Sequence, residues 1–333
     1  MKIIKGKSLK HLLNFKLSLD RIELSENHDK NNCQPYIKQY ASEMVFRNCH
    51  ACKSEKYNFF VKAYGFDYVE CNHCGLIFMN PSPSSNLLEE YYKNLQSKNT
   101  ASITFDEKSF NQRCELIYNP KIKYIQNFIQ NPKCLDIGTG NGEFVYSAKK
   151  NGWDINGLEP NPEGIKYAKE NLDIKLVEMN IETYLKKEKG KIPYNLITLW
   201  GSFEHLSDPN NLIRIISEKM ANESYLVIEV PKADSLSTLL NRMNPKLSIR
   251  HLCPPAHITL WTLKAFQILL KQHNWDIKGV WYYGMDALEL VSYLNQDYDG
   301  YIINKLVTIA DDIQSLIDQN HFSDLMTIIA QKG

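Results

Sequence analysis

Apolar and polar residues follow a regular succession from Lys133 to the C-terminus. Short apolar runs, which indicate buried strands, alternate with segments in which apolar residues recur at helical spacing. Strands that alternate with helices predict a parallel sheet covered on both faces, and therefore a doubly wound, mostly parallel α/β fold. The predicted strands are Cys134–Ile137, Asp154–Leu158, Lys175–Glu178, Tyr194–Trp200, Tyr225–Val230, Ile277–Tyr283 and Leu325–Ala330.

Capping residues mark where the helices between these strands begin. Asn, Asp and Thr side chains accept hydrogen bonds from the first free N–H groups of a helix, and proline is favoured at its first position. The predicted caps are Asn161 before Pro162, Asn180 before Ile181, Asp208 before Pro209, and Thr262. Between Pro231 and about Trp261 we expect a long irregular stretch, and from Asp286 to about Asn320 a helical insertion that packs on the core or on a second subunit.

A glycine-rich turn follows the first strand, in the run Asp136-Ile-Gly-Thr-Gly-Asn-Gly142. Three features support a ligand at this turn: the acid before it, the helix after it, and Glu159 about twenty residues further on. A dinucleotide fingerprint requires a third glycine at position 143, which is Glu143 here. An acidic side chain there disfavours a phosphate, so a cofactor with a cationic centre fits better. The alternative is a tight turn that binds nothing.

Two Cys-x2-Cys pairs precede the sheet: Cys49 with Cys52, and Cys71 with Cys74. This spacing suits a tetrahedral Zn²⁺ held by four thiolates, which leaves no position for water and therefore predicts a structural site. The alternatives are a disulfide pair or unliganded thiols. Four other cysteines follow no such spacing, and we interpret them as ordinary buried or half-buried thiols: Cys33, Cys114, Cys134 and Cys253.

Composition bounds the remaining choices. The 333 residues include 39 Lys and Arg against 38 Asp and Glu, so no overall field attracts nucleic acid. There is no apolar run of membrane-spanning length. Eight cysteines without a secretory signal indicate a reducing, cytoplasmic setting. We divide the chain into an extension and linker (1–42), a zinc-ribbon module (43–80), a helical lid or connector (81–130) and a core (131–333).

The N-terminal part of the chain carries little sequence signal. Met1–Ile22 is basic, and we expect a loosely docked extension, with an amphipathic membrane-surface helix as the alternative. Leu24–Gln39 is polar and is predicted to be an irregular lead-in to the zinc module.

The glycine turn Asp136-x-Gly-x-Gly-x-Gly resembles motif I of the class I S-adenosylmethionine-dependent methyltransferases. The block Cys71-x2-Cys-Gly-Leu-Ile-Phe-x-Asn-Pro-x-Pro, followed by a helix with Tyr91 and Tyr92, is similar to the N-terminal zinc module of a subfamily that mostly modifies sugars and other small metabolites. The resemblance implies a Rossmann-like, seven-stranded sheet whose last strand is antiparallel. It also implies that the tyrosine helix leans over the cofactor cleft; the alternative is that it packs the zinc module onto the core.

The same resemblance implies a set of cofactor-binding residues. The glycine turn would face the methionine part of S-adenosylmethionine, Glu159 would bind the ribose hydroxyls, and Asn180 would meet the adenine unless it only caps its helix. The candidates are Asp136, Gly138, Thr139, Gly140, Gly142, Glu159, Asn180 and Trp200.

The candidate catalytic residues lie beyond the fourth strand and in the stretch before Trp261. The first and fourth strands flank the point where sheet order reverses, so Glu204 and His205 should lie beside the ligand crevice. His205 is a candidate general base, with Glu204 orienting it or lining the pocket. His257 is a second candidate base or acceptor ligand, and Arg250 could meet an anionic acceptor. Alternatively, both histidines only hold loop backbone and Arg250 is solvated.

Three functions follow from these observations. The first is an S-adenosylmethionine-dependent methyltransferase with structural zinc that acts on a small molecule, plausibly a sugar or nucleotide-sugar. The second is an RNA methyltransferase that grips its substrate with the zinc ribbon. The third is a non-catalytic protein that binds the cofactor.

Overall fold

The computed structural model describes residues 26–88, 90–91, 106–247, 250–294 and 305–333. The predicted extension Met1–Ile22 and Tyr92 lie outside these residues. In the described part of the chain, no helix combines the length and the apolar character needed to cross a membrane.

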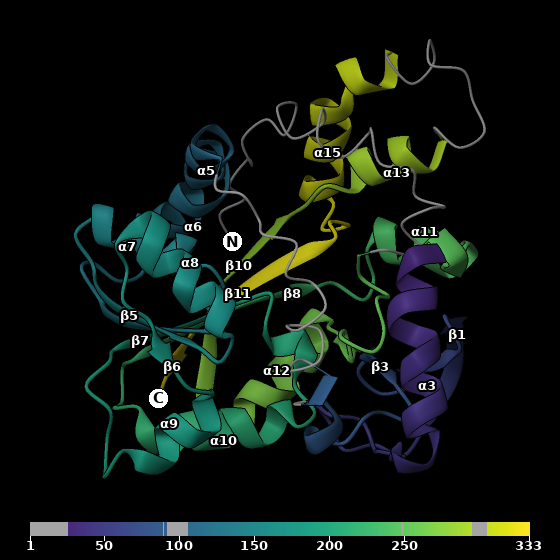
Figure 1. Ribbon diagram of the computed structural model, residues 1–333, viewed down its shortest axis with the longest axis horizontal. Coiled ribbons are helices and arrows are strands. Elements are labelled where there is room, and N and C mark those ends of the chain that lie inside the picture. Colours follow the sequence, from purple (N-terminus) through teal and green to yellow (C-terminus); the bar gives the residue numbers. More distant parts are fainter. Residues whose placement is uncertain (1–25, 89, 92–105, 248–249, 295–304) are drawn as a thin grey trace.

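A seven-stranded sheet forms the centre of the molecule, with the strand order β10-β11-β8-β7-β4-β5-β6 (Figure 1). All neighbouring strands are parallel except β11, which runs antiparallel between β8 and β10. This confirms the predicted α/β, Rossmann-like, doubly wound and mostly parallel fold. The strands are β4 (Lys133–Ile137), β5 (Asp154–Glu159), β6 (Val177–Glu178), β7 (Leu196–Trp200), β8 (Tyr225–Pro231), β10 (Trp275–Tyr283) and β11 (Leu325–Lys332).

Helices cover both faces of the sheet because side chains alternate between its faces. Cys134 and Ile155 face α6 (Asn119–Ile125), α7 (Glu143–Lys150) and α8 (Pro162–Leu172). Leu135 and Ile137 face α9 (Ile181–Lys187), α10 (Pro209–Lys219) and α12 (Leu263–Lys271). The predicted caps are confirmed, since each capping side chain accepts a backbone N–H at the start of its helix: Asn161, Asn180, Asp208 and Thr262.

A second, four-stranded antiparallel sheet carries the cysteine pairs. Its strands are β1 (Tyr57–Ala63), β2 (Phe66–Cys71), β3 (Ile77–Met79) and β9 (Thr259–Leu260). The fourth strand comes from the stretch after β8, which was predicted to be irregular. That prediction is wrong at three places, because the stretch contains β9, α11 (Leu236–Met243) and a 3-10 turn at Pro245–Leu247. Strand β9 is only two residues long, and its partner β3 lies far away in the sequence.

The lead-in before the zinc module is helical, not irregular as predicted. A π-helical turn (Asp29–Cys33) continues into α3 (Gln34–Tyr40) and a 3-10 turn (Ala41–Glu43). Cys33, Tyr36 and Tyr40 are buried against the strands of the small sheet. These three residues recur at intervals of three and four, so the polar composition concealed one apolar helical face.

Among its described residues, the C-terminal insertion contains α13 (Asp286–Leu294) and α15 (Ala310–Gln319), which pack on each other beyond the ends of β10 and β11 (Figure 1). Ala287, Leu288 and Ala310 form a small buried cluster between them. The predicted insertion therefore has a core of its own.

Candidate cofactor and acceptor site

The glycine turn lies between β4 and α7 at the carboxyl edge of the sheet. Gly140 has φ +57°, and a Cβ built on it would meet no atom within 4 Å, so this side of the turn is open. A Cβ on Gly164 of α8 would instead lie 2.8 Å from the Gly140 carbonyl oxygen. Because Gly164 has no side chain, α8 can pack closely against the backbone of the glycine turn.

Glu159 joins this turn to the end of β5. Its Oε2 accepts a hydrogen bond from Gly140 N at 2.7 Å, and its Oε1 accepts one from Asn161 N at 2.8 Å. Burial raises the pKa of this carboxyl group. A carboxylate oxygen has two lone pairs, so each oxygen keeps an acceptor position for a ribose hydroxyl. The residue fits the role that the sequence predicted for it.

The other predicted cofactor residues lie close to the turn but differ in their contacts. Asp136 is buried and accepts a hydrogen bond from Thr198 Oγ1 at 2.6 Å, and burial raises its pKa to about 6. The Thr139 methyl group packs at Gly157 of β5. Asn180 Oδ1 accepts from Thr183 N at 2.8 Å, which is the capping alternative; its contact with adenine stays a prediction.

A buried lysine stands beside Trp200. Lys121 of α6 is 4% exposed, and its Nζ lies 4.4 Å from the centre of the Trp200 ring. Its Nζ also lies 2.9 Å from Glu229 Oε2, and Tyr283 donates a hydrogen bond to the same carboxylate. Burial raises the pKa of both Asp136 and Glu204, and Lys121 partly offsets this increase in each. The Lys121 ammonium therefore lies close to both carboxyl groups of the site.

Sequence reasoning missed Lys121 and Glu229. The available signal was a lysine on the apolar face of a helix, three and four residues before Tyr124 and Ile125. For Glu229 the sequence signal was weaker: it is a charged residue within an otherwise apolar strand.

The helical segment before the core closes over the glycine turn. It comprises α5 (Glu107–Arg113), a π-helical turn (Cys114–Tyr118) and α6. Arg113 pairs with Glu143 at the start of α7, and Tyr118 donates to the same carboxylate at 2.7 Å. Glu143, which argued against a phosphate at this turn, is therefore neutralised by a neighbouring cation.

The structure brings the three predicted catalytic residues together. Glu204 and His205 lie in a 3-10 turn (Phe203–His205) after β7, and His257 reaches them from the stretch after β8. One ligand atom from each lies within 4.8 Å of the others. The two imidazole rings meet edge to face, with their centres 4.8 Å apart. Glu204 Oε1 lies 4.0 Å from His205 Nε2.

Backbone carbonyl groups orient both rings. His257 Nδ1 donates to His251 O at 3.0 Å. His205 Nδ1 donates to Ala256 O at 2.9 Å. Both histidines therefore bind loop backbone, and this contact is compatible with a role in proton transfer, so the catalytic role and its alternative both stay predictions.

Burial sets the protonation of this group. It raises the pKa of Glu204 to about 8, with a further increase from Glu229, so this carboxyl is protonated at neutral pH. Burial lowers the pKa of His205, and burial together with His205 lowers that of His257 well below its ordinary value. The site therefore holds two neutral imidazoles beside a neutral carboxylic acid.

The structure places Arg250, expected on the acceptor side, and Tyr91, expected over the cofactor cleft, in other surroundings. Arg250 is half-buried, and its guanidinium is bound by Asp324 and Glu289 at 2.7 and 3.3 Å. Tyr91 is buried and meets the Tyr36 ring edge to face at 5.5 Å, so this residue packs the zinc module instead of leaning over the cleft.

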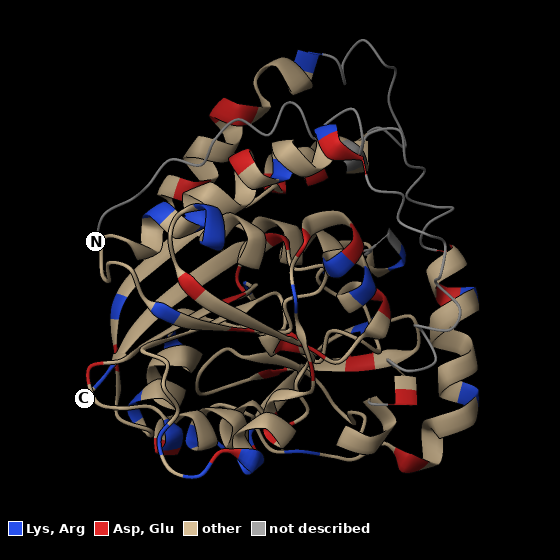
Figure 2. Ribbon diagram, turned by 60° about the vertical axis from the view of Figure 1, so that its left-hand side comes forward, with Lys and Arg blue, Asp and Glu red and all other residues tan. Residues whose placement is uncertain are grey.

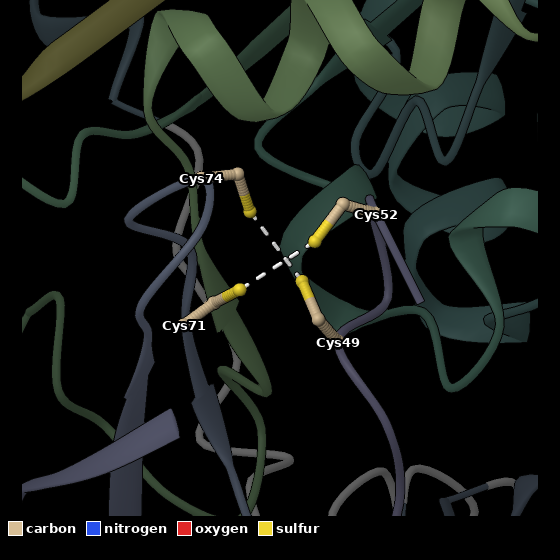
Figure 3. A group of neighbouring side chains, drawn as sticks. All are labelled: Cys49, Cys52, Cys71 and Cys74. Carbon is tan, nitrogen blue, oxygen red and sulfur yellow. Dashed lines mark hydrogen bonds between the residues drawn. The ribbon is translucent and has the colours of Figure 1, made fainter. Parts of the chain in front are cut away.

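The four predicted zinc ligands converge on one point (Figure 3). The Cys49–Cys74 and Cys52–Cys71 sulfur pairs are each 3.5 Å apart. Tetrahedral Zn²⁺ with bonds of about 2.3 Å separates its sulfur ligands by roughly 3.8 Å, so the donor set fits this metal. His50 is buried against Phe78 and lies outside the cluster.

Known proteins resemble this chain over different lengths. It is 42% identical over 67 residues to the U6 small nuclear RNA (adenine-(43)-N(6))-methyltransferase of Drosophila melanogaster, covering 19% of this chain and 22% of that protein. It is 25% identical over 166 residues to the mitochondrial ubiquinone biosynthesis O-methyltransferase of Schizosaccharomyces pombe, covering 47% and 61%. The chain thus spans less than two thirds of these curated relatives.

A solved SAM-dependent methyltransferase from Archaeoglobus fulgidus is 21% identical, with a TM-score of 0.48, covering 68% of this chain and 100% of that one. The model of the family described as "Methyltransferase domain" matches residues 48–278, which is more than half of the chain. The chain belongs to this methyltransferase domain family.

Proposed function

We propose that the protein is an S-adenosylmethionine-dependent methyltransferase that acts on a small-molecule acceptor. The main supporting observation is the contact between Glu159 and Gly140 N, which brings the ribose-binding candidate onto the open glycine turn. This arrangement lies at the switch point between β4 and β7, where ligands bind in doubly wound folds.

The residues around the turn fit this cofactor. Gly138, Gly140 and Gly142 let the backbone approach a ligand closely, and Glu159 keeps free lone pairs for ribose hydroxyls. The Trp200 indole N–H is buried without a hydrogen-bond partner among the described residues. When bound, S-adenosylmethionine supplies an electrophilic methyl group on a sulfonium centre.

The acceptor must lose a proton as it is methylated, and the histidine pair provides for this. His257 donates its Nδ1–H to His251 O, so its Nε2 carries the lone pair that takes a proton. His205 packs against that ring and is also held neutral by burial. Protonated Glu204 adds no negative charge beside the two histidines. Its Oε2 is buried and has no hydrogen-bond partner among the described residues.

We further propose a sugar or nucleotide-sugar as the acceptor, on the resemblance of the zinc module to the subfamily that modifies such molecules. A specific observation favours RNA as a second candidate: the Drosophila relative is named for a small nuclear RNA. The charge balance weighs against it, since Lys and Arg are interspersed with Asp and Glu over the molecule (Figure 2) and the net charge is +1.

The test is incubation of the purified protein with methyl-labelled S-adenosylmethionine and either nucleotide-sugars or total RNA. We expect label in the sugar fraction and its loss in the double variant His205→Asn, His257→Asn. Label in RNA, with binding that weakens steeply as salt rises, would favour the second candidate. Absence of S-adenosylhomocysteine binding by calorimetry would refute the activity itself.

A further inference from the structure

A buried ionic cluster lies directly behind the histidine pair. Arg250 and His251 come from the stretch after β8, Glu289 from the insertion, and Asp324 from the residue before β11. Asp324 is fully buried and is the residue immediately before β11. Because β11 is paired on both sides in the large sheet, Asp324 stands on a rigid part of the fold.

Both Asp324 carboxylate oxygens are bound. Oδ2 accepts from His251 Nε2 at 2.9 Å and from Arg250 Nη1 at 2.7 Å, and Oδ1 accepts from Met285 N at 2.9 Å. Although burial opposes ionisation, Arg250 and His251 hold the pKa of Asp324 well below its usual range. The Asp324 carboxylate is therefore a fixed negative charge with three directed bonds.

His251, Glu289 and Asp324 have the spacing of a metal-binding group, with ligand atoms within 4.8 Å of one another. The Arg250 guanidinium already binds both of its carboxylates. An arginine therefore supplies the positive charge that a metal would bring. The cluster is a clamp on the chain at positions 250 and 251.

The clamp continues to the catalytic candidates through one backbone carbonyl. His251 O accepts the Nδ1–H of His257, and the His257 ring packs on His205 at 4.8 Å. His251 Nδ1 is buried with no partner in the described part of the chain, so the bond from Nε2 to Asp324 is what fixes the His251 side chain. The position of the His251 carbonyl, and with it the tautomer of His257, depends on that bond.

We propose that Asp324 is a positioning residue for the reaction: through His251 it selects the His257 tautomer that leaves Nε2 free to take the acceptor's proton. This role rests on the proposed methyltransferase function. The insertion contacts this clamp, because α13 contributes Glu289 to it.

The test uses the full chain labelled with ¹⁵N-histidine, without cofactor, and long-range ¹H–¹⁵N correlation spectra that distinguish the two imidazole tautomers. In the wild type we expect His257 as the Nδ1–H form. Asp324→Asn leaves one acceptor oxygen where the carboxylate has two, so the side chain cannot accept from His251, Arg250 and Met285 N together. We expect it to shift the His257 tautomer ratio by about fivefold, the equivalent of one neutral hydrogen bond.

Glu289→Gln is the matched control: it alters the clamp at its contact with Arg250 and keeps the bond between His251 and Asp324, so it should leave the His257 tautomer unchanged. A folded Asp324→Asn protein with the wild-type His257 signals would overturn the positioning role. If that variant does not fold, His251→Gln is measured in its place: it retains an amide donor for Asp324 but not the imidazole geometry, and unchanged His257 signals there would equally overturn it.

Calorimetry with S-adenosylhomocysteine on the wild type separates the two hypotheses. Absence of binding would refute the proposed function, whereas the tautomer measurement reports only on the clamp.

Discussion

Removing the buried ammonium of Lys121 should destabilise the protein strongly. The Lys121 and Glu229 side chains are 6% and 9% exposed, and Glu229 then keeps only the Tyr283 hydroxyl among its polar partners named above. Breaking a buried ion pair by removing one member costs about 3–5 kcal/mol, because the other charge is left uncompensated. We therefore expect Lys121→Met to lower the free energy of unfolding by about 3–5 kcal/mol at pH 7.

A double-mutant cycle measured by denaturant unfolding tests this magnitude. The double variant Lys121→Met, Glu229→Gln carries no buried charge at this position, so it should be more stable than Lys121→Met alone. Lys123→Met is the matched control: it lies on the exposed side of the same helix and should change the free energy of unfolding by no more than about 0.5 kcal/mol. A loss below about 1 kcal/mol for Lys121→Met, or additive single variants, would show that the pair is not coupled as the structure indicates.

Three further predictions follow from the site. Cys71→Ser should reduce bound zinc below one ion per chain and, because metal binding contributes on the order of 10 kcal/mol, unfold the small sheet; unchanged metal content and circular dichroism would contradict this. Gly164→Ala should weaken S-adenosylhomocysteine binding by up to about 10²-fold in calorimetry, because the new Cβ would lie 2.8 Å from the Gly140 carbonyl oxygen and displace the glycine turn. The control Glu163→Ala, on the exposed side of the same helix, should leave this binding unchanged. Glu204 has a pKa of about 8 in the folded protein, above its ordinary value of 4.5, so its contribution to stability is complete below pH 4.5 and is lost as the pH rises toward 8. Between these pH values, Glu204→Gln should remove a pH dependence of the free energy of unfolding of at most about 1.4 kcal/mol per pH unit. Parallel curves of stability against pH for the wild type and the variant would refute the shift.

The parts of the fold that the sequence predicted are those specified by neighbouring residues. The Asn161 side chain caps its helix by accepting from a backbone N–H two residues further on. The apolar run of β4 is predicted as a buried strand from its own residues. The glycine turn and the two cysteine pairs are similarly local, since their chemistry is contained in runs of four to seven letters. Even the lead-in helix could have been predicted, because Cys33, Tyr36 and Tyr40 share one helical face.

The parts that could not be predicted depend on contacts between distant residues. Lys121 and Glu229 are 108 positions apart, and neither indicates its partner. Asp324 looks like an ordinary turn residue before a strand until Arg250 and His251 are placed beside it. Buried charges are tolerated only when paired, so recognising one member required knowledge of the fold that brings the other.

The small sheet that carries the four-cysteine cluster also holds the segment that contains His257. Its fourth strand, β9, begins two residues after His257, and Tyr68 of β2 donates to the His257 carbonyl oxygen at 2.7 Å. The Thr262 hydroxyl in turn donates to the Cys74 carbonyl oxygen at 2.6 Å, so a zinc ligand and the cap of α12 are directly joined. The segment that carries His257 is thus held by the zinc module on one side and by Asp324 on the other. Because the small sheet shares strand β9 with this segment, we propose that a zinc ion held by the four cysteines would act on the proposed reaction by fixing where His257 lies.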